Sequence, residues 1–185
     1  MTKQEIQKLD TNLLGHPKPL FSLSMVELWE RFAFYGIRSL LVLFMATTIS
    51  KGGLGISTEY ASAIYGIFAG CLYLAALPGG WITDNYLGQK KALFLGSFII
   101  ALGHISIVIY FKHTYIFPRT SFIVIGTGFF KTSASVTVGM LYKQNDTRCD
   151  TGYTIFYIGI NIGAFIAPLI CGFVQAKWNY HLGFG

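Results

Sequence analysis

Long apolar runs constrain this chain more than any other feature of its sequence. A helix needs about 20 apolar residues to cross roughly 30 Å of hydrocarbon. Consecutive apolar runs of that length cover residues 23–49, 58–80, 91–111, 117–142 and 153–176. They are too long for the strands of a membrane barrel, which need about 10 residues each, and backbone groups in lipid have only each other as partners. The runs therefore predict an all-α membrane protein with about five transmembrane helices.

The composition agrees with lipid as the surroundings of this chain. Only 12% of the residues are charged and 53% are apolar, whereas about 25% are charged in an ordinary soluble domain. The formal net charge is +6, but the basic residues are scattered between the apolar runs and do not form one basic stretch. We therefore expect the lipid bilayer as a partner, and no nucleic acid.

The basic residues also indicate how the chain is oriented. If the runs cross the membrane in alternation, one side receives Lys3, Lys8, Lys18, Lys90, Lys91, Lys143 and Arg148. The other side receives Lys51, Lys112, Arg119 and Lys177. Because cytoplasmic segments carry the excess of Lys and Arg, this bias predicts a cytoplasmic N-terminus. We expect residues 1–20 to be a cytoplasmic segment, not a cleaved signal peptide, and residues 21–185 to form the transmembrane bundle.

Nothing in the sequence has the spacing of an enzyme active site or of a metal centre. The patterns GxSxG and HExxH are absent, the histidines are dispersed, and Cys71, Cys149 and Cys171 lack metal or redox spacing. We expect no catalytic residues, no metal and no disulfide framework. An integral-membrane hydrolase is the weakest of the alternatives.

Ionic side chains inside the first apolar run add a second constraint. At 100° per residue, Glu27, Glu30, Arg31 and Arg38 fall within about 100° of arc, with Tyr35 just beside them. Each charge near the bilayer centre costs roughly 2.5–3.5 kcal/mol, so such a stripe is not expected to face lipid. It predicts a bundle interior or a water-filled cavity. Glu27 and Arg31 have the i,i+4 spacing of an ion pair.

Several interpretations of these ions are open at the level of the sequence. The cluster can be a structural salt bridge that fixes helix packing, or the glutamates can be wetted at the cytoplasmic interface. It can also bind a zwitterion, and a carboxylate then takes up a proton when the ligand draws its cation away. Lys131, in the fourth run, needs a partner in the membrane. Glu27 or Glu30 is the candidate, and snorkelling to an interface is the alternative.

Small residues and one proline mark the helices that are expected to pack closely or to bend. Gly159 with Gly163, and Gly66 with Gly70, have the small-xxx-small spacing that is typical of close helix packing. Pro168 predicts a bend in the fifth helix, which suits a gating role.

Four segments of the chain resemble the motifs of one family. "ELWERFAFYG" resembles the ExxERFxYYG signature on the first helix of the proton-dependent oligopeptide transporter (POT/PTR) family. "GTGFFKTSASVTVGMLY" and "FYIGINIGAFIAPLICG" are similar to its motifs GTGLLKPNVSxxVGxLY and FYMGINLGAFIAP on the fourth and fifth helices. "GGWITDNYLGQKK" is similar to the loop motif GGxxxDxxxGxxK of the major facilitator superfamily. Together these segments span residues 27–172.

The resemblance implies a fold and an activity. The fold has two six-helix halves around a central cavity, and the activity is uptake of di- and tripeptides with protons, without another cofactor. It implies proton coupling by Glu27, Glu30, Arg31 and Lys131. It implies peptide contacts by Arg31, Tyr35, Arg38, Lys131 and Asn161. It also implies that Asp84 stabilises one state of the gate. The chain departs from the motifs at Phe34, where the signature has Tyr, and at Thr132 and Ser133, which replace Pro-Asn.

The resemblance covers only the first part of such a transporter. Five of its twelve or more helices are present, so we expect a fragment of the N-terminal half, whose missing partner is the C-terminal transmembrane half. The expected location is a bacterial inner membrane. The alternatives are a major-facilitator transporter of another small solute, and a non-transporting membrane fragment with a structural salt-bridge cluster.

Overall fold

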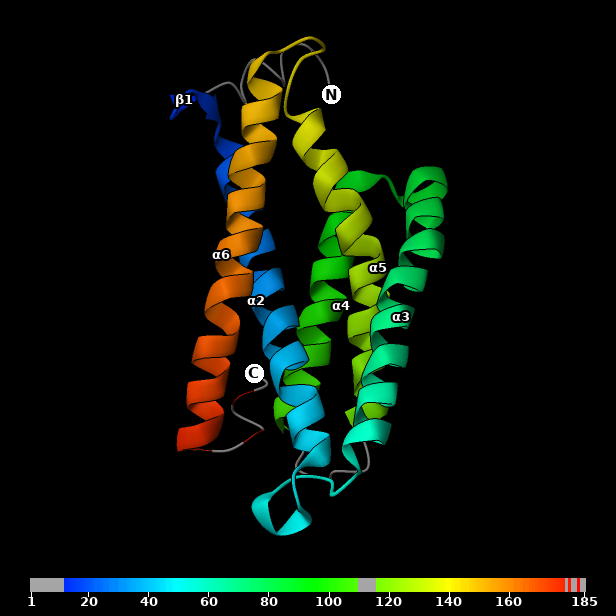
Figure 1. Ribbon diagram of the computed structural model, residues 1–185. Helices are drawn as coiled ribbons and strands as arrows, with labels where there is room; N and C mark the ends of the chain where they lie inside the picture. The colour runs from blue at the N-terminus through cyan, green and yellow to red at the C-terminus, as the bar shows by residue number, and fades with distance from the viewer. Residues whose placement is uncertain (1–11, 110–115, 179, 181–182, 184–185) are drawn as a thin grey trace.

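Long helices that stand side by side dominate the structure (Figure 1). The computed structural model describes residues 12–109, 116–178, 180 and 183. The helices are α2 (Lys18–Ala46), α3 (Thr58–Ile82), α4 (Gln89–Ile109), α5 (Ile116–Met140) and α6 (Arg148–Lys177). The shorter elements are β1 (Asn12–Leu13), β2 (His16–Pro17), the 3-10 turn η1 (Ile49–Lys51) and the π-helical turn η2 (Thr83–Leu87).

The described helices have the length and composition of membrane spans. The segments Thr58–Leu87, Gln89–Ile107, Thr120–Met140 and Arg148–Lys177 are each long and apolar enough to cross a bilayer. Helix α2, with 29 residues, has the length as well but carries the ionic stripe. The prediction of an all-α, multi-pass integral membrane protein is confirmed. The β1–β2 hairpin, with two residues in each strand, is a local addition to that fold.

Two helices begin earlier than their apolar runs. Helix α2 begins at Lys18, because Pro17 takes the N-cap position and a second proline falls in the first turn, where the missing N–H is tolerated. Helix α6 begins at Arg148, and the carboxylate of Asp150 in its first turn complements the positive end of the helix dipole. The first turns of α2 and α6 are polar, and they therefore lie outside the apolar runs that predict these helices.

Close packing between helices rests on glycines. Helix α2 packs mainly on α6, whereas α3 and α4 both pack on α5. A Cβ added to Gly159 would lie 2.9 Å from the Ser24 carbonyl oxygen, and one added to Gly163 would collide with the carbonyl of Leu28. The small-xxx-small step on α6 is thus confirmed. The step at Gly66 and Gly70 is not, because nothing lies within 4 Å of a Cβ added at either one in the described chain.

Gly163→Val is expected to push α6 away from α2 and to lower the free energy of unfolding by about 1–3 kcal/mol. The new side chain would meet the Leu28 carbonyl and the Arg31 Cβ, which lies 3.2 Å from the added Cβ. Thermal unfolding in detergent micelles measures the change. Gly70→Val is the matched control, because it carries the same intrinsic helix cost in open space. Equal Tm values for the two variants would contradict this packing.

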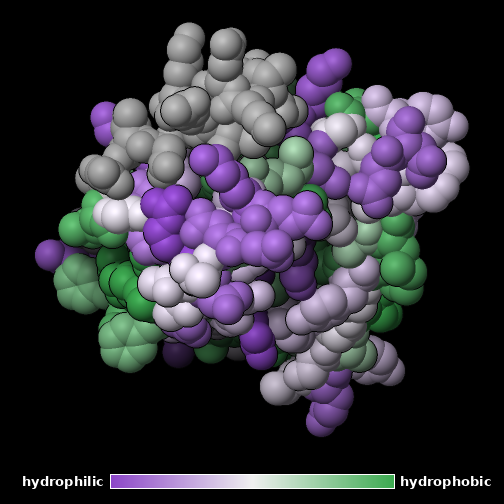
Figure 2. All heavy atoms as spheres, turned by 90° about the horizontal axis from the view of Figure 1, so that it is seen from above, coloured by the Kyte–Doolittle hydropathy of each residue, from purple (hydrophilic) through white to green (hydrophobic). Residues whose placement is uncertain are grey.

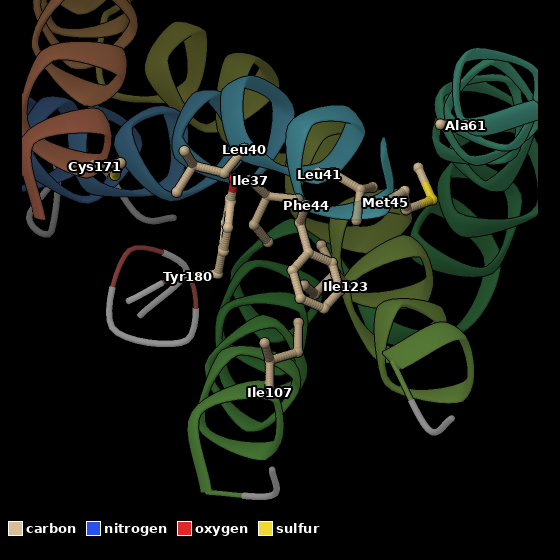
Figure 3. Packing of buried hydrophobic residues seen from close by; sticks show 10 residues of the cluster. All are labelled: Ile37, Leu40, Leu41, Phe44, Met45, Ala61, Ile107, Ile123, Cys171 and Tyr180. Atoms are coloured by element: carbon tan, nitrogen blue, oxygen red, sulfur yellow. The ribbon is translucent and has the colours of Figure 1, made fainter. Parts of the chain in front are cut away.

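Two buried apolar clusters hold the bundle together. The first surrounds α2 from Ile37 onward, and Figure 3 shows Phe44 directed from α2 towards Ile123 and Ile107. The second joins the first turns of α2 to other helices through Leu20, Leu23, Ile100, Phe130, Ala134, Val138, Leu141, Tyr142 and Phe156. Along α2 the second cluster ends at Leu23. Glu27, Glu30 and Arg31 therefore occupy the interval of α2 between the two clusters.

The end of the bundle with the β1–β2 hairpin, η2 and the α5–α6 connection is polar. Figure 2 shows hydrophilic side chains gathered over this end and hydrophobic ones along its rim. Lys143 in the α5–α6 connection, Lys18 in the first turn of α2, and Lys90 and Lys91 in the first turn of α4 are exposed. This is the end that the predicted orientation places in the cytoplasm.

Asp146→Asn is expected to lower the Tm at neutral pH, because Asp146 accepts hydrogen bonds from the Arg148 backbone N–H, Nε and Nη2 at 3.0, 3.1 and 2.8 Å. These contacts lower the pKa of Asp146 from 3.8 to about 2. A folded-state pKa below the unfolded one gives stabilisation that is present above about pH 4 and is lost as the pH falls towards 2. The Tm difference from the unchanged protein should shrink over that window. A constant difference would contradict the ion pair.

Candidate functional site

Glu27, Glu30 and Arg31 form one buried ion cluster on α2. Arg31 Nε donates to Glu27 Oε1 at 2.9 Å and lies 2.6 Å from Glu30 Oε2. The three residues are only 3%, 8% and 9% exposed. Because Glu27 and Arg31 are one helical turn apart, the helix itself brings their side chains close enough to form an ion pair. The ion pair that the spacing predicts is confirmed, and it lies inside the bundle.

The cluster has two carboxylates for one guanidinium. Glu27 Oε2 and Glu30 Oε2 are buried without a hydrogen-bond partner in the described part of the chain. For Glu30 Oε2 the distance to Arg31 Nε is that of an ion pair, but the geometry is not that of a hydrogen bond. Two ionised glutamates would leave an excess negative charge in an apolar interior, which is costly. A proton on one carboxylate, or a further cation, removes that excess, so the arrangement can accept a proton.

Lys131, half-buried on α5, lies near this cluster but pairs differently from the prediction. Its ammonium lies 4.4 Å from the centroid of the Tyr73 ring on α3, in a cation–π contact. No ion pair between Lys131 and a carboxylate is present among the residues that the structure describes. Its charge still acts through space on both Glu27 and Glu30. Lys131 therefore carries a positive charge that no carboxylate neutralises by direct contact within the described residues.

The remaining ions and rings of α2 form separate contacts. The Arg31 guanidinium carbon lies 5.5 Å from the Phe34 ring centroid, so a ring remains beneath this arginine although the tyrosine hydroxyl of the motif is missing. Farther along the helix, the Arg38 guanidinium carbon lies 5.6 Å from the Tyr35 ring centroid. Arg38 is exposed and Tyr35 is half-buried. The ionic stripe therefore divides into a buried cluster and an accessible arginine.

Three further predicted residues lie apart from the cluster. Asn161 is exposed and donates to the carbonyl of Tyr157, one turn earlier on α6, at 2.8 Å. Pro168 is accommodated inside α6, which continues to Lys177. Asp84 is exposed in η2 and accepts a hydrogen bond from Gln89 Nε2 at 2.8 Å. Their roles in binding and gating stay predictions.

Tyr73 is the site residue that sequence reasoning did not assign to Lys131. Its ring position depends on how α3 and α5 are rotated against each other, and the spacing along one helix holds no signal for that.

An apolar recess of about 310 Å³ between α3 and α5 is lined by Ile64, Ile67, Phe68, Cys71, Thr120, Ser121, Val124 and Ile125. It contains none of the predicted site residues. Within residues 12–109 and 116–178, no group of three His, Cys, Asp or Glu side chains could hold a metal ion.

Known proteins of one kind match this chain. The profile of the POT family, PTR2, matches residues 90–185, more than half of the chain. The peptide transporter YePEPT of Yersinia enterocolitica is 56% identical over 173 residues, which cover 92% of this chain and 34% of that protein. A di-/tripeptide transporter of Lactococcus lactis is 43% identical over 183 residues, which cover 98% of this chain and 37% of that protein.

Solved structures agree with these relatives. A mutant form of a peptide transporter POT in complex with alafosfalin matches with a TM-score of 0.94 and 43% identity, over 100% of this chain and 39% of that one. A POT family transporter in complex with 5-aminolevulinic acid matches with a TM-score of 0.91 and 39% identity, over 97% of this chain and 37% of that one. The chain thus spans little more than a third of the length of the proteins it matches. The predicted fold class, part of the N-terminal half of a major-facilitator fold, is confirmed, and the chain belongs to the POT family.

Proposed function

We propose that this chain is the N-terminal part of a proton-coupled symporter that takes up di- and tripeptides. The observation that carries the proposal is the buried pair of carboxylates, Glu27 and Glu30, on the single guanidinium of Arg31. Membership in the POT family and the relatives named as peptide transporters support it. In this proposal the protein is not an enzyme, and the proton is its only coupling partner besides the peptide.

In this proposal, competition between charges links the transport of peptide to the transport of protons. Without peptide, Arg31 holds both glutamates. A peptide carboxylate draws Arg31 and Lys131 towards itself, and the glutamate that loses its cation becomes a stronger base and takes up a proton. Release of peptide and proton restores the first state. Because Lys131 lies on the Tyr73 ring and not on a carboxylate, its charge is available to the peptide. For this coupling to work, peptide and proton must bind one of the two states more tightly than the other.

Peptide contacts are assigned to the accessible polar residues of α2 and α6. Arg38 and Asn161 are exposed and Tyr35 is half-buried in this chain, so they can face a cavity whose other wall is the C-terminal half. We assign gating to Asp84, in the π-helical turn, and to Pro168, inside α6. The Lys-rich polar end supports a cytoplasmic N-terminus, in a bacterial inner membrane.

Uptake of labelled dialanine tests this function. Proteoliposomes that hold the full-length protein receive an inward proton gradient, and a protonophore is added in a parallel arm. Accumulation above the external concentration that disappears with the protonophore is expected. Equal uptake in both arms would reject proton coupling, and no dialanine uptake with a functional gradient would reject the peptide as substrate.

A second candidate substrate is a small zwitterion that is not a peptide. The match to a POT family transporter in complex with 5-aminolevulinic acid favours it. Such a molecule also presents a carboxylate to Arg31 and Lys131, so the same charge competition applies. Labelled 5-aminolevulinic acid, with and without excess dialanine, separates the two: uptake of this compound alone, without uptake of dialanine, would favour the second candidate.

A further inference from the structure

The β1–β2 hairpin lies against the connection between α5 and α6. His16 Nδ1 and the Tyr142 hydroxyl are 2.9 Å apart, and their rings meet edge to face with centroids 6.0 Å apart. Arg148 Nη1 donates to the Gly15 carbonyl at 2.9 Å. We call these contacts of Gly15, His16, Tyr142 and Arg148 the N-terminal clasp. They join the start of α2 to the end of α5 and the start of α6, between residues 126 and 133 positions apart.

Tyr142 is packed firmly into this end of the bundle. The residue is 8% exposed, and a Cβ added to Gly152 on α6 would collide with its ring and hydroxyl. Burial raises the pKa of Tyr142, so the phenol keeps its proton at neutral pH. Which of the two groups donates in the bond to His16 Nδ1 depends on the tautomer of the ring. Arg148 is held in turn by Asp146. The clasp is therefore a hydrogen-bonded unit anchored on the buried Tyr142, with its Arg148–Gly15 contact at the surface.

The segments that carry the two halves of the clasp each include a backbone conformation that residues with side chains rarely adopt. Leu14 and Gly15, at the hairpin turn, have φ values of 55° and 80°, and Asn145 has a φ of 67°. A leucine in the left-handed region is disfavoured and persists only where surrounding contacts determine it. The Leu14 side chain is 88% exposed and does not supply those contacts. The antiparallel pairing of β1 with β2 closes this two-residue turn, with Leu13 opposite His16.

Side-chain packing connects the clasp to the ion cluster. Leu23 on α2 belongs to the same buried cluster as Phe130 on α5 and Tyr142, which lies just after the end of α5. Glu27 follows Leu23 by one helical turn, and Lys131 follows Phe130 directly. A shift of α2 along α5 at this end would therefore pull Leu23 away from Phe130. It would also change the distance between the ion cluster on α2 and Lys131 on α5.

We propose that the N-terminal clasp sets the register of α2 against α5, and so holds Arg31 and Lys131 at the separation that peptide binding requires. His16 and Tyr142 are then positioning residues, since they act through α2 and α5 without touching the peptide. The consequence for transport rests on the proposed function. The consequence for structure rests on the contacts alone.

Hydrogen–deuterium exchange of the full-length protein in nanodiscs tests the structural part. His16→Phe keeps a ring against Tyr142 but removes the nitrogen, and Tyr142→Phe keeps the ring but removes the hydroxyl. Each variant is expected to speed exchange in residues 20–28 about fivefold, and the double variant no more than either single one, because both remove the same bond. Exchange in residues 37–45, at the other cluster, is expected to stay unchanged. Additive effects, or unchanged exchange in residues 20–28, would overturn the clasp.

Initial rates of dialanine uptake test the positioning role. His16→Phe is expected to raise KM roughly threefold or more and to keep the maximal rate within about twofold, because fewer molecules are competent to bind. Loss of folded protein alone would lower the maximal rate and leave KM unchanged. Gly152→Ala, which pushes on Tyr142 from α6, is expected to reproduce the KM effect. Leu14→Gly relieves the turn, keeps the clasp contacts and is expected to keep the original KM.

The two possible failures are distinguishable. If the unchanged protein takes up dialanine and His16→Phe has the same KM, the positioning role is overturned. If the unchanged protein takes up no peptide, the proposed function fails, and the exchange result alone decides whether the clasp sets the register.

Discussion

Arg31→Met is expected to lower the free energy of unfolding by roughly 3–5 kcal/mol, because it leaves Glu27 and Glu30 buried without their cation. Methionine keeps an unbranched, flexible stem in the same space, so the cost comes from the carboxylates more than from a cavity. Unfolding in detergent micelles at neutral pH measures the difference.

The matched control removes the charges that this substitution leaves behind. Arg31→Met combined with Glu27→Gln and Glu30→Gln is expected to recover most of the lost stability, because neutral amides cost less to bury than unpaired carboxylates. If Arg31→Met alone is as stable as the unchanged protein, the three side chains do not form a buried ion cluster.

Glu27→Gln combined with Glu30→Gln is expected to abolish accumulation of peptide against its gradient. One proton moved across 100 mV is worth about 2.3 kcal/mol, which supports roughly 50-fold accumulation. A glutamine cannot gain or lose a proton, so the variant should only equilibrate the peptide. The steady-state ratio of internal to external labelled dialanine, under an imposed gradient, measures this.

Counterflow provides the control for this variant. Exchange of labelled for unlabelled peptide across the membrane needs no net proton release, and a glutamine resembles the protonated glutamate. The double variant should therefore keep exchange while it loses accumulation. Loss of both activities would indicate a binding or folding defect, and full accumulation would exclude these two glutamates as the coupling groups.

The long helices could be predicted because a bilayer offers the backbone no partner outside the chain, so the length of an apolar run decides the element. The starts of α2 and α6 could not be predicted in this way, because Lys18 and Arg148 begin polar helical turns. The positions of these turns are set by cap geometry and the helix dipole, and not by hydropathy. The β1–β2 hairpin could not be predicted either, because each of its strands has only two residues. No periodicity can be recognised over that length.

Contacts within one helix could be predicted at the site, and contacts between helices could not. The pair of Glu27 and Arg31 follows from one turn of α2. The partner of Lys131 depends on the rotation of α3 against α5, which brings Tyr73 beneath the ammonium although the available acids lie on α2. Glycine spacing on α3 has the same limit, because it permits a close approach without specifying a neighbour.

Peptide-induced proton movement is the most direct test of coupling through Glu27 and Glu30. Proteoliposomes with the full-length protein are suspended in weak buffer without an imposed gradient, and the external pH is recorded after dialanine is added. The charge competition at Arg31 predicts alkalinisation outside as protons enter with peptide, and no pH change with the Glu27→Gln, Glu30→Gln variant. The same alkalinisation in both proteins, or none in the unchanged protein while it takes up dialanine, would contradict it.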